Sequence, residues 1–126
     1  NSLVQEMCSQ EVEANKISKT DKQWLLDLER VVLNEPNPDQ LSLFAVAFEV
    51  SVSERQLHRN IKKFLKMTPN KYIRILKLHK AKKLIEEYTY RTISEVAYAV
   101  GFSDAHYFST LFYKQYGAMP KDLLPG

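Results

Sequence analysis

Residues 93–120 read ISEVAYAVGFSDAHYFSTLFYKQYGAMP, and residues 43–69 read LFAVAFEVSVSERQLHRNIKKFLKMTP. The two stretches match each other in their apolar positions, in a turn residue and in a final proline. At an offset of 50 residues, the matched pairs are Val46 with Val96, Ala47 with Ala97, and Ser51 with Gly101. At an offset of 51, they are Leu57 with Phe108, Ile61 with Phe112, and Pro69 with Pro120. The match indicates an internal repeat whose second copy has one extra residue in its turn.

Each copy has the layout of a helix-turn-helix, with a short helix, a tight turn and a longer helix that has a polar outer face. A small alanine allows the two helices to cross closely, and Gly101 relieves strain in the second turn. In DNA-binding proteins of this layout, the second helix fits the major groove. One copy alone is also typical of a generic pair of packed helices. Two copies joined by a basic helix favour DNA binding.

The rest of the chain predicts an all-α fold, because 3 Gly and 5 Pro are the main helix breakers and β-branched alternation is nearly absent. We expect a first helix capped by Thr20 or Asp21, with one apolar face made by Trp24, Leu25, Leu28, Val31 and Val32. A short helix over residues 39–48 and a helix over 54–65, capped by Ser53, follow. The connecting helix, over about residues 70–87, is expected to bury Ile73, Leu76 or Leu78, Ala81 and Leu84.

This pattern predicts a short linker or N-terminal extension and one helical DNA-binding domain. The extension covers residues 1–19 and the domain covers residues 20–126. Within the domain, the first helix-turn-helix is expected over about 39–68 and the second over about 92–124. Gly117 is expected to end the last long helix, and Pro120 to begin a final helical turn.

Charge is concentrated in the middle of the chain. The net charge is +3, but residues 41–84 hold 11 Lys and Arg against 2 Asp and Glu. A concentrated cationic block is what a polyanion-binding surface requires. A run of charge is, however, more often a solvated helical face, and an acidic protein partner is the alternative to DNA.

The sequence resembles the DNA-binding domain of the AraC/XylS family over about residues 39–124. The resemblance is carried by residues 53–63, 77–84, 93–97, 101–104 and 117–120, together with Tyr107, Phe108 and Phe112. It implies about seven helices, with two recognition helices and a rigid connecting helix between them. The sequence departs from the family at Ser51, where glycine is common, at Tyr113-Lys114, where a basic pair is common, and at Ala105, an exposed position that is often polar.

Candidate DNA contacts lie on both predicted recognition helices. Because Leu57 and Ile61 face the core, Arg55, His58 and Arg59 lie on the other side of the first helix, where an arginine fork matches a guanine edge. The resemblance implies that these three side chains contact bases. It implies the same for Ala105, His106, Ser109 and Thr110 on the second helix. The alternative for each arginine is that its side chain contacts a DNA phosphate and no base. Candidate phosphate contacts are Ser53, Lys62, Lys63, Lys66, Lys71, Arg74, Lys77, Tyr113 and Lys114. For those on the connecting helix, the alternative is that the side chain has a structural role or is simply solvated.

Other function classes have little support in the sequence. His58, His79 and His106 do not form a metal-binding motif, and the sequence has no phosphate-binding glycine loop or nucleophile elbow. We therefore expect no catalytic residue, cofactor or metal. Cys8 is the single cysteine, and no apolar run has the ~18–20 residues that span a bilayer. The expected partners are double-stranded DNA, RNA polymerase and other domains of a longer cytoplasmic chain, such as a two-component regulator.

Overall fold

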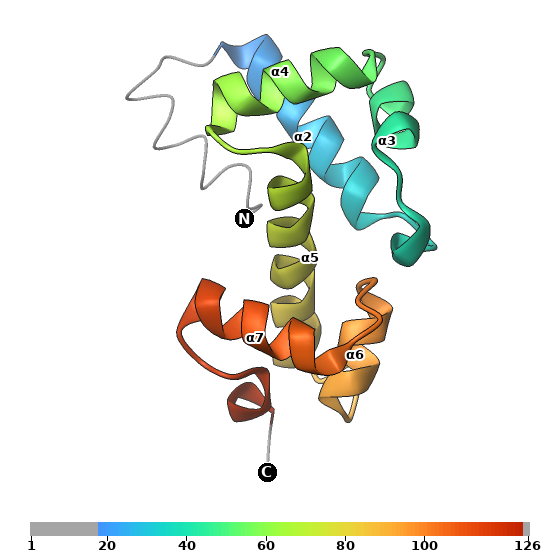
Figure 1. Cartoon of the computed structure of the whole chain (residues 1–126). Coiled ribbons are helices and arrows are strands. Elements are labelled where there is room, and N and C mark those ends of the chain that lie inside the picture. Colours follow the sequence, from blue (N-terminus) through green and yellow to red (C-terminus); the bar gives the residue numbers. More distant parts are fainter. Residues whose placement is uncertain (1–17, 125–126) are drawn as a thin grey trace. The chain divides into compact units, whose positions relative to one another are not determined.

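The computed structural model describes residues 18–124, which are helical and contain no β-strand within that range (Figure 1). The elements are α2 (Lys19–Leu33), η1 (Pro38–Gln40), α3 (Leu43–Glu49), α4 (Glu54–Leu65), α5 (Pro69–Glu86), α6 (Ile93–Ala99), α7 (Ala105–Tyr116) and η2 (Pro120–Leu123). The all-α class is confirmed, and the six α-helices of the described range are close to the expected number of about seven. Cys8 and residues 1–17 of the predicted extension lie outside the described residues.

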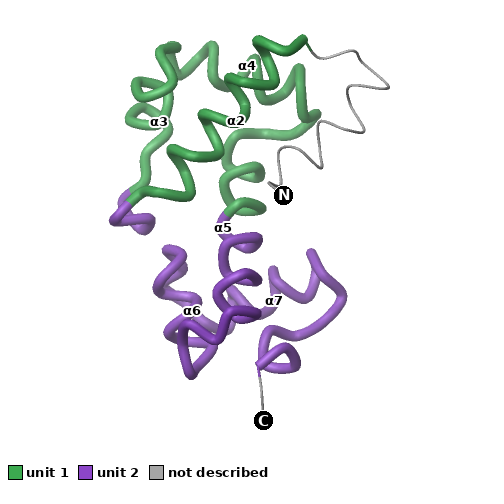
Figure 2. Tube along the Cα trace, turned by 180° about the vertical axis from the view of Figure 1, so that it is seen from behind, with its two compact units in different colours: residues 1–35, 41–76 green, residues 36–40, 77–126 purple. Residues whose placement is uncertain are grey.

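The chain divides into two compact units (Figure 2). Unit 1 contains the described residues up to Glu35 and Leu41–Leu76, and unit 2 contains Pro36–Gln40 and the described residues from Lys77 onward. Each unit holds one helix-turn-helix, α3 with α4 in unit 1 and α6 with α7 in unit 2. The segment Pro36–Gln40 is the unexpected part, since it precedes α3 in the sequence but belongs to the unit of α6 and α7.

Two helix starts differ from the sequence prediction. α2 begins at Lys19, because Ser18, and not Thr20 or Asp21, caps it by accepting a hydrogen bond from the Asp21 backbone N–H at 3.1 Å. The helix expected over residues 39–48 begins only at Leu43, because Ser42 caps it in the same way, with the Ala45 N–H at 3.1 Å.

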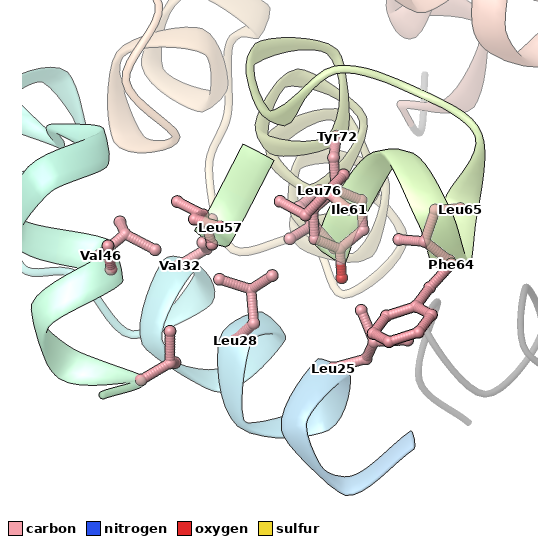
Figure 3. Packing of buried hydrophobic residues seen from close by; sticks show 12 residues of the cluster. Leu25, Leu28, Val32, Val46, Leu57, Ile61, Phe64, Leu65, Tyr72 and Leu76 are labelled. Atoms are coloured by element: carbon pink, nitrogen blue, oxygen red, sulfur yellow. The ribbon is translucent and has the colours of Figure 1, made fainter. Parts of the chain in front are cut away.

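The core of unit 1 lies between α2, α3, α4 and the first part of α5 (Figure 3). It contains Leu25, Leu28 and Val32 of α2, Val46 of α3, Leu57 and Ile61 of α4, and Tyr72 and Leu76 of α5. The Trp24 ring lies edge-on to Phe64 at 6.5 Å between centroids, and its indole N–H donates to the Val50 carbonyl at 3.2 Å. The predicted apolar face of α2 thus packs against the first helix-turn-helix.

The core of unit 2 is built around aromatic side chains of α7. Phe108 and Phe112 are buried and pack with Val96, Ala97 and Val100 of α6, and with Leu78, Ala81 and Ile85 of α5. The rings of Phe102, Phe108, Phe112 and Tyr116 form a series in this core. The centroids of successive rings lie 4.7 to 5.7 Å apart. These contacts fix α7 on the rest of its unit through large apolar surfaces.

The buried residues of α5 were predicted only in part. Leu76, Leu78 and Ala81 are buried as expected, whereas Ile73 and Leu84 are only half-buried. The prediction missed Tyr72, Ile75 and Ile85. Tyr72 and Leu76 serve unit 1, while Leu78, Ala81 and Ile85 serve unit 2. A single apolar stripe therefore could not describe this helix, because its two halves bury different stripes in different cores.

Candidate nucleic-acid interface

The two helix-turn-helix turns have the same backbone hydrogen bonds. In the first, the N–H groups of Ser51 and Val52 donate to the carbonyls of Phe48 and Ala47 at 3.1 and 3.0 Å. In the second, the N–H groups of Gly101 and Phe102 donate to the carbonyls of Tyr98 and Ala97 at 3.1 and 2.9 Å. The repeat seen in the sequence is therefore also a repeat of backbone geometry.

Both turns pass through a left-handed residue at the same position. Ser51 has φ 61 and Gly101 has φ 97. A serine at φ 61 is uncommon, because a Cβ atom is disfavoured there, and Ser51 is one of the positions where the sequence departs from the family pattern. Two residues after Ser51, Ser53 caps α4, whereas Asp104 caps α7 three residues after Gly101. The extra residue of the second copy thus lies between the turn and the cap.

On α4, the candidate base-contacting side chains lie opposite the core. Leu57 and Ile61 are buried, while Arg55, His58 and Arg59 are exposed. Arg55 and Arg59 are one helical turn apart, so the two guanidinium groups lie on one stripe of the helix. The sequence prediction placed these side chains outward, and the structure does so.

The predicted phosphate contacts of unit 1 lie on α4, at its two caps and on the first part of α5. Lys62, Lys63, Lys66 and Lys71 are exposed, and Arg74 is half-buried. Some of these groups also have structural contacts. The Lys66 ammonium donates to the Lys63 carbonyl at 3.0 Å, and the Lys63 ammonium lies 5.7 Å from the Phe64 ring centroid. The Ser53 hydroxyl accepts the Gln56 N–H at 3.1 Å, so it is used as a helix cap.

On α7, the predicted contacts are divided between exposed and half-buried positions. His106, Thr110, Tyr113 and Lys114 are exposed. The Thr110 hydroxyl donates to the His106 carbonyl at 3.1 Å, which holds that side chain against its own helix. Ser109 is half-buried.

Ala105 differs from the expectation that it occupies an exposed position. It is half-buried and packs against the core of unit 2. The reason is its place on the helix, since Ala105 precedes the buried Phe108 by three residues and so lies on nearly the same side of α7. Ala105 therefore presents only part of a methyl group to the surface.

The 51-residue offset pairs the outward positions of the two long helices. Arg55 corresponds to His106, His58 to Ser109, and Arg59 to Thr110. Each cationic arginine of α4 is thus replaced on α7 by a side chain that is shorter or lacks a fixed positive charge. Unit 1 has the stronger potential for charge-assisted hydrogen bonds.

Lys77, which the sequence placed among the phosphate candidates, is half-buried in unit 2. Its ammonium lies 5.9 Å from the Phe102 ring centroid. Burial lowers the pKa of Lys77, and the nearby Asp39 carboxylate opposes that effect by raising it. The side chain therefore has protein partners, which distinguishes it from the exposed lysines of α4.

Comparison with known proteins agrees with this geometry. A family model described as "Helix-turn-helix domain" matches residues 46–125. The chain belongs to the AraC/XylS family of helix-turn-helix domains.

The AraC/XylS domain is similar to several transcription regulators. The HTH-type transcriptional activator RhaS of Shigella boydii is 38% identical over 88 residues, which cover 70% of this chain and 31% of RhaS. The chain thus matches less than one third of the length of that relative. An AraC-type transcriptional regulator from Chromobacterium violaceum has a TM-score of 0.74 at 27% identity, covering 84% of this chain and 93% of that one. The C-terminal domain of AraT, a response regulator from Geobacillus stearothermophilus, has a TM-score of 0.65 at 28% identity, covering 86% of each chain.

Among the described residues, no group of three or more His, Cys, Asp or Glu side chains is placed to hold a metal ion. The same residues include no helix with the length and apolar character needed to cross a membrane. The exposed faces of α4 and α7, which carry the outward polar and basic side chains, are the candidate site of the domain.

Proposed function

We propose that the domain binds double-stranded DNA at specific sequences by placing α4 and α7 in adjacent major grooves, and that it regulates transcription. The observation that carries this proposal is the outer face of α4, where Arg55 and Arg59 are exposed directly opposite the buried Leu57 and Ile61. A helix held in this way offers two guanidinium forks to base edges while its other side remains in the core. The same helix-turn-helix geometry at α7 supplies a second reading element.

Within this proposal, base contacts and phosphate contacts have different roles. Arg55, His58 and Arg59 on α4, and Ala105, His106, Ser109 and Thr110 on α7, contact base edges. Ser53, Lys62, Lys63, Lys66, Lys71, Arg74, Tyr113 and Lys114 contact phosphates and provide affinity that does not depend on sequence. Because α7 lacks arginine at the matched positions, its half-site contributes less discrimination than that of α4.

The role of the complete protein is part of the same proposal. RhaS is named as a transcriptional activator and AraT as a response regulator, and the chain matches only a part of RhaS. We infer that the domain works beside other domains of a longer, cytoplasmic regulator, with a two-component input as one arrangement, and that RNA polymerase is its partner at the promoter. Its role is regulatory and not catalytic.

The test begins with selection of preferred sites from random duplexes, followed by titration of the selected duplex against salt. We expect log K to fall steeply and linearly with log salt, and we expect the selected site to bind at least about a thousandfold more tightly than a scrambled duplex. Tight binding to an acidic protein with no sequence preference for DNA would instead support the protein-interaction alternative.

Two variants of α4 separate the two kinds of contact. Arg59→Ala should weaken binding to the selected site by about 1–3 kcal/mol and relax the preference at one base pair. Lys63→Ala is the matched control, since Lys63 is exposed on the same helix and is proposed to contact phosphate. Lys63→Ala should weaken binding to all duplexes alike, and it should reduce the slope of log K against log salt by about one unit, because one phosphate contact is lost. Equal losses on all duplexes from both variants would refute the assignment of Arg59 to a base.

A further inference from the structure

The segment Pro36–Gln40, here called the strap, packs on the turn of the second helix-turn-helix although it lies far from that turn in the sequence. Pro38 approaches Gly101 so closely that a Cβ atom on Gly101 would lie 2.9 Å from the Pro38 carbonyl carbon and 3.0 Å from its Cβ and oxygen. Real Cβ atoms essentially never show a distance as short as the first, and the other two are tighter than nine in ten real Cβ contacts. The absence of a side chain at Gly101 is therefore what allows the strap to lie against the turn.

An electrostatic interaction relates the strap to Lys77 of α5, which in turn lies near the Phe102 ring. The Asp39 carboxylate attracts the Lys77 ammonium, which lies 5.9 Å from the Phe102 ring centroid. Phe102 follows Gly101 and contacts α7 through Tyr107 and Phe108, at centroid distances of 6.4 and 5.3 Å. The ring of the residue after the turn glycine thus lies near a cation of α5 and near two aromatic rings in the first turn of α7.

The two turns differ in this respect. Ser51, which corresponds to Gly101, is exposed, while Gly101 is half-buried against Pro38. The first turn has its own backbone hydrogen bonds and tolerates a serine at φ 61. The strap contact is therefore a feature of unit 2 that the helix-turn-helix geometry itself does not require.

We propose that Pro38, Asp39 and Lys77 are positioning residues for the second recognition helix: the strap clamps the Gly101–Phe102 turn and thereby sets the aim of α7 at its half-site. In this role Lys77 acts through Phe102 and does not contact a phosphate. The inference rests on the proposed function, because it presupposes that α7 reads a half-site.

Removal of one charge provides a test in which positioning and simple electrostatics predict different results. Asp39→Asn removes a negative charge from a protein that binds a polyanion, so electrostatics alone predicts tighter binding to every duplex. A uniform gain of this kind leaves discrimination between duplexes unchanged, whereas positioning predicts weaker discrimination at the α7 half-site. Glu86→Gln is the matched control, because Glu86 is exposed at the end of α5 and makes the same change of charge.

The experiment uses a duplex selected by the wild-type domain, in which base pairs that respond to Arg59→Ala define the α4 half-site and those that respond to His106→Ala define the α7 half-site. The measured quantity is the ratio of Kd for a duplex with the α7 half-site scrambled to Kd for the intact duplex. Asp39→Asn and Lys77→Met should each reduce this ratio about three- to tenfold, which corresponds to about 0.7–1.4 kcal/mol at about 1.4 kcal/mol per tenfold change. The corresponding ratio for the α4 half-site should remain at the wild-type value.

Salt dependence separates positioning from phosphate contact at Lys77. Lys77→Met should retain the wild-type slope of log K against log salt, whereas a residue that contacts a phosphate reduces that slope by about one unit. Lys83→Met, an exposed lysine of the same helix, is the control for loss of a distant charge. Asp39→Glu keeps the carboxylate and should restore most of the ratio. Thermal melting by circular dichroism identifies any variant that fails to fold, in which case Pro38→Ala takes its place.

The outcomes are distinguishable. A wild-type domain without preference for any half-site overturns both the proposed function and this inference. A wild-type domain that discriminates at the α7 half-site, with Asp39→Asn and Lys77→Met retaining the full ratio, overturns the inference alone. A reduced salt slope for Lys77→Met assigns Lys77 to a phosphate and also overturns its positioning role.

Discussion

Gly101→Ala is the substitution for which the structure gives the sharpest expected loss of stability. Gly101 has φ +97, a region that residues with a Cβ atom rarely adopt. An added Cβ would also lie 2.9 Å from the carbonyl carbon of Pro38, which is backbone and cannot rotate away as a flexible side chain would. The substitution therefore combines backbone strain with a steric clash.

The two contributions can be estimated separately. Left-handed backbone disfavours a residue with a Cβ atom by about 1–2 kcal/mol. Forcing an extra methyl group into a packed site costs about 1–3 kcal/mol. Gly101→Ala should therefore lower the free energy of unfolding of unit 2 by about 2–5 kcal/mol. Gly117, at φ +74 with no atom within 4 Å of an added Cβ, is the matched control. Gly117→Ala should lose only the backbone contribution of about 1–2 kcal/mol.

The assay is urea unfolding followed by two probes. Far-UV circular dichroism reports the helices of both units, while fluorescence of Trp24, the single tryptophan, reports unit 1. We expect Gly101→Ala to move the circular dichroism transition to lower urea at unchanged slope for the affected unit. Ser51→Gly, at the matched turn of unit 1, should change stability by less than about 1 kcal/mol, because glycine releases strain but adds freedom to the unfolded chain.

The comparison between the two glycines decides the outcome. If Gly101→Ala and Gly117→Ala agree to within about 0.5 kcal/mol, the close packing of Pro38 on Gly101 contributes nothing and the steric argument is wrong. If both variants are as stable as the wild type, the backbone argument is wrong as well.

Three further substitutions test other contacts. Phe108→Ala leaves a cavity at the centre of the unit 2 core, so it should lower the free energy of unfolding, measured in urea, by about 3–5 kcal/mol. A loss below about 1 kcal/mol would contradict the packing described. Asp104→Ala removes the side-chain acceptor of the His106 and Tyr107 N–H groups, so it should lower the free energy of unfolding by about 1 kcal/mol, as followed by thermal melting. An unchanged melting temperature would show that water caps α7 equally well. Trp24→Phe leaves the Val50 carbonyl without its indole donor, so about 1–3 kcal/mol should be lost in urea unfolding, and a neutral result would mean that this hydrogen bond has no net value.

The helices and their inward and outward faces could be read from the sequence because a helical face repeats every three or four residues. The spacing of Leu57 and Ile61 identified the buried side of α4, and the spacing of Phe108 and Phe112 did the same for α7. The exposed positions of Arg55, His58 and Arg59 follow directly from those buried neighbours. The caps were less certain, since Ser18, Thr20 and Asp21 are all suitable capping residues and only Ser18 lies at the right distance from an unpaired N–H group.

Residues between the two recognition helices were harder to place. α5 supplies two different cores, so its apolar residues do not fall on one stripe and Tyr72, Ile75 and Ile85 were missed. Lys77 illustrates the same difficulty for charge, because the sequence contains no sign that Asp39 and Phe102 lie beside it. The half-buried position of Ala105 on α7, by contrast, follows from its three-residue spacing to Phe108, a signal that the sequence did contain.

Amino-acid order alone determined the all-helical fold, the doubled helix-turn-helix and the outward-facing basic side chains of α4, since all of these are written in short-range periodicity and in a match between two segments. Only the folded chain decided that residues 36–40 belong with α6 and α7, that Pro38 lies on Gly101, and that Lys77 is half-buried. The physical reason is that such contacts join residues far apart along the chain. Contacts between distant segments depend on how each core packs, and they have no regular spacing along the sequence as the face of a single helix does.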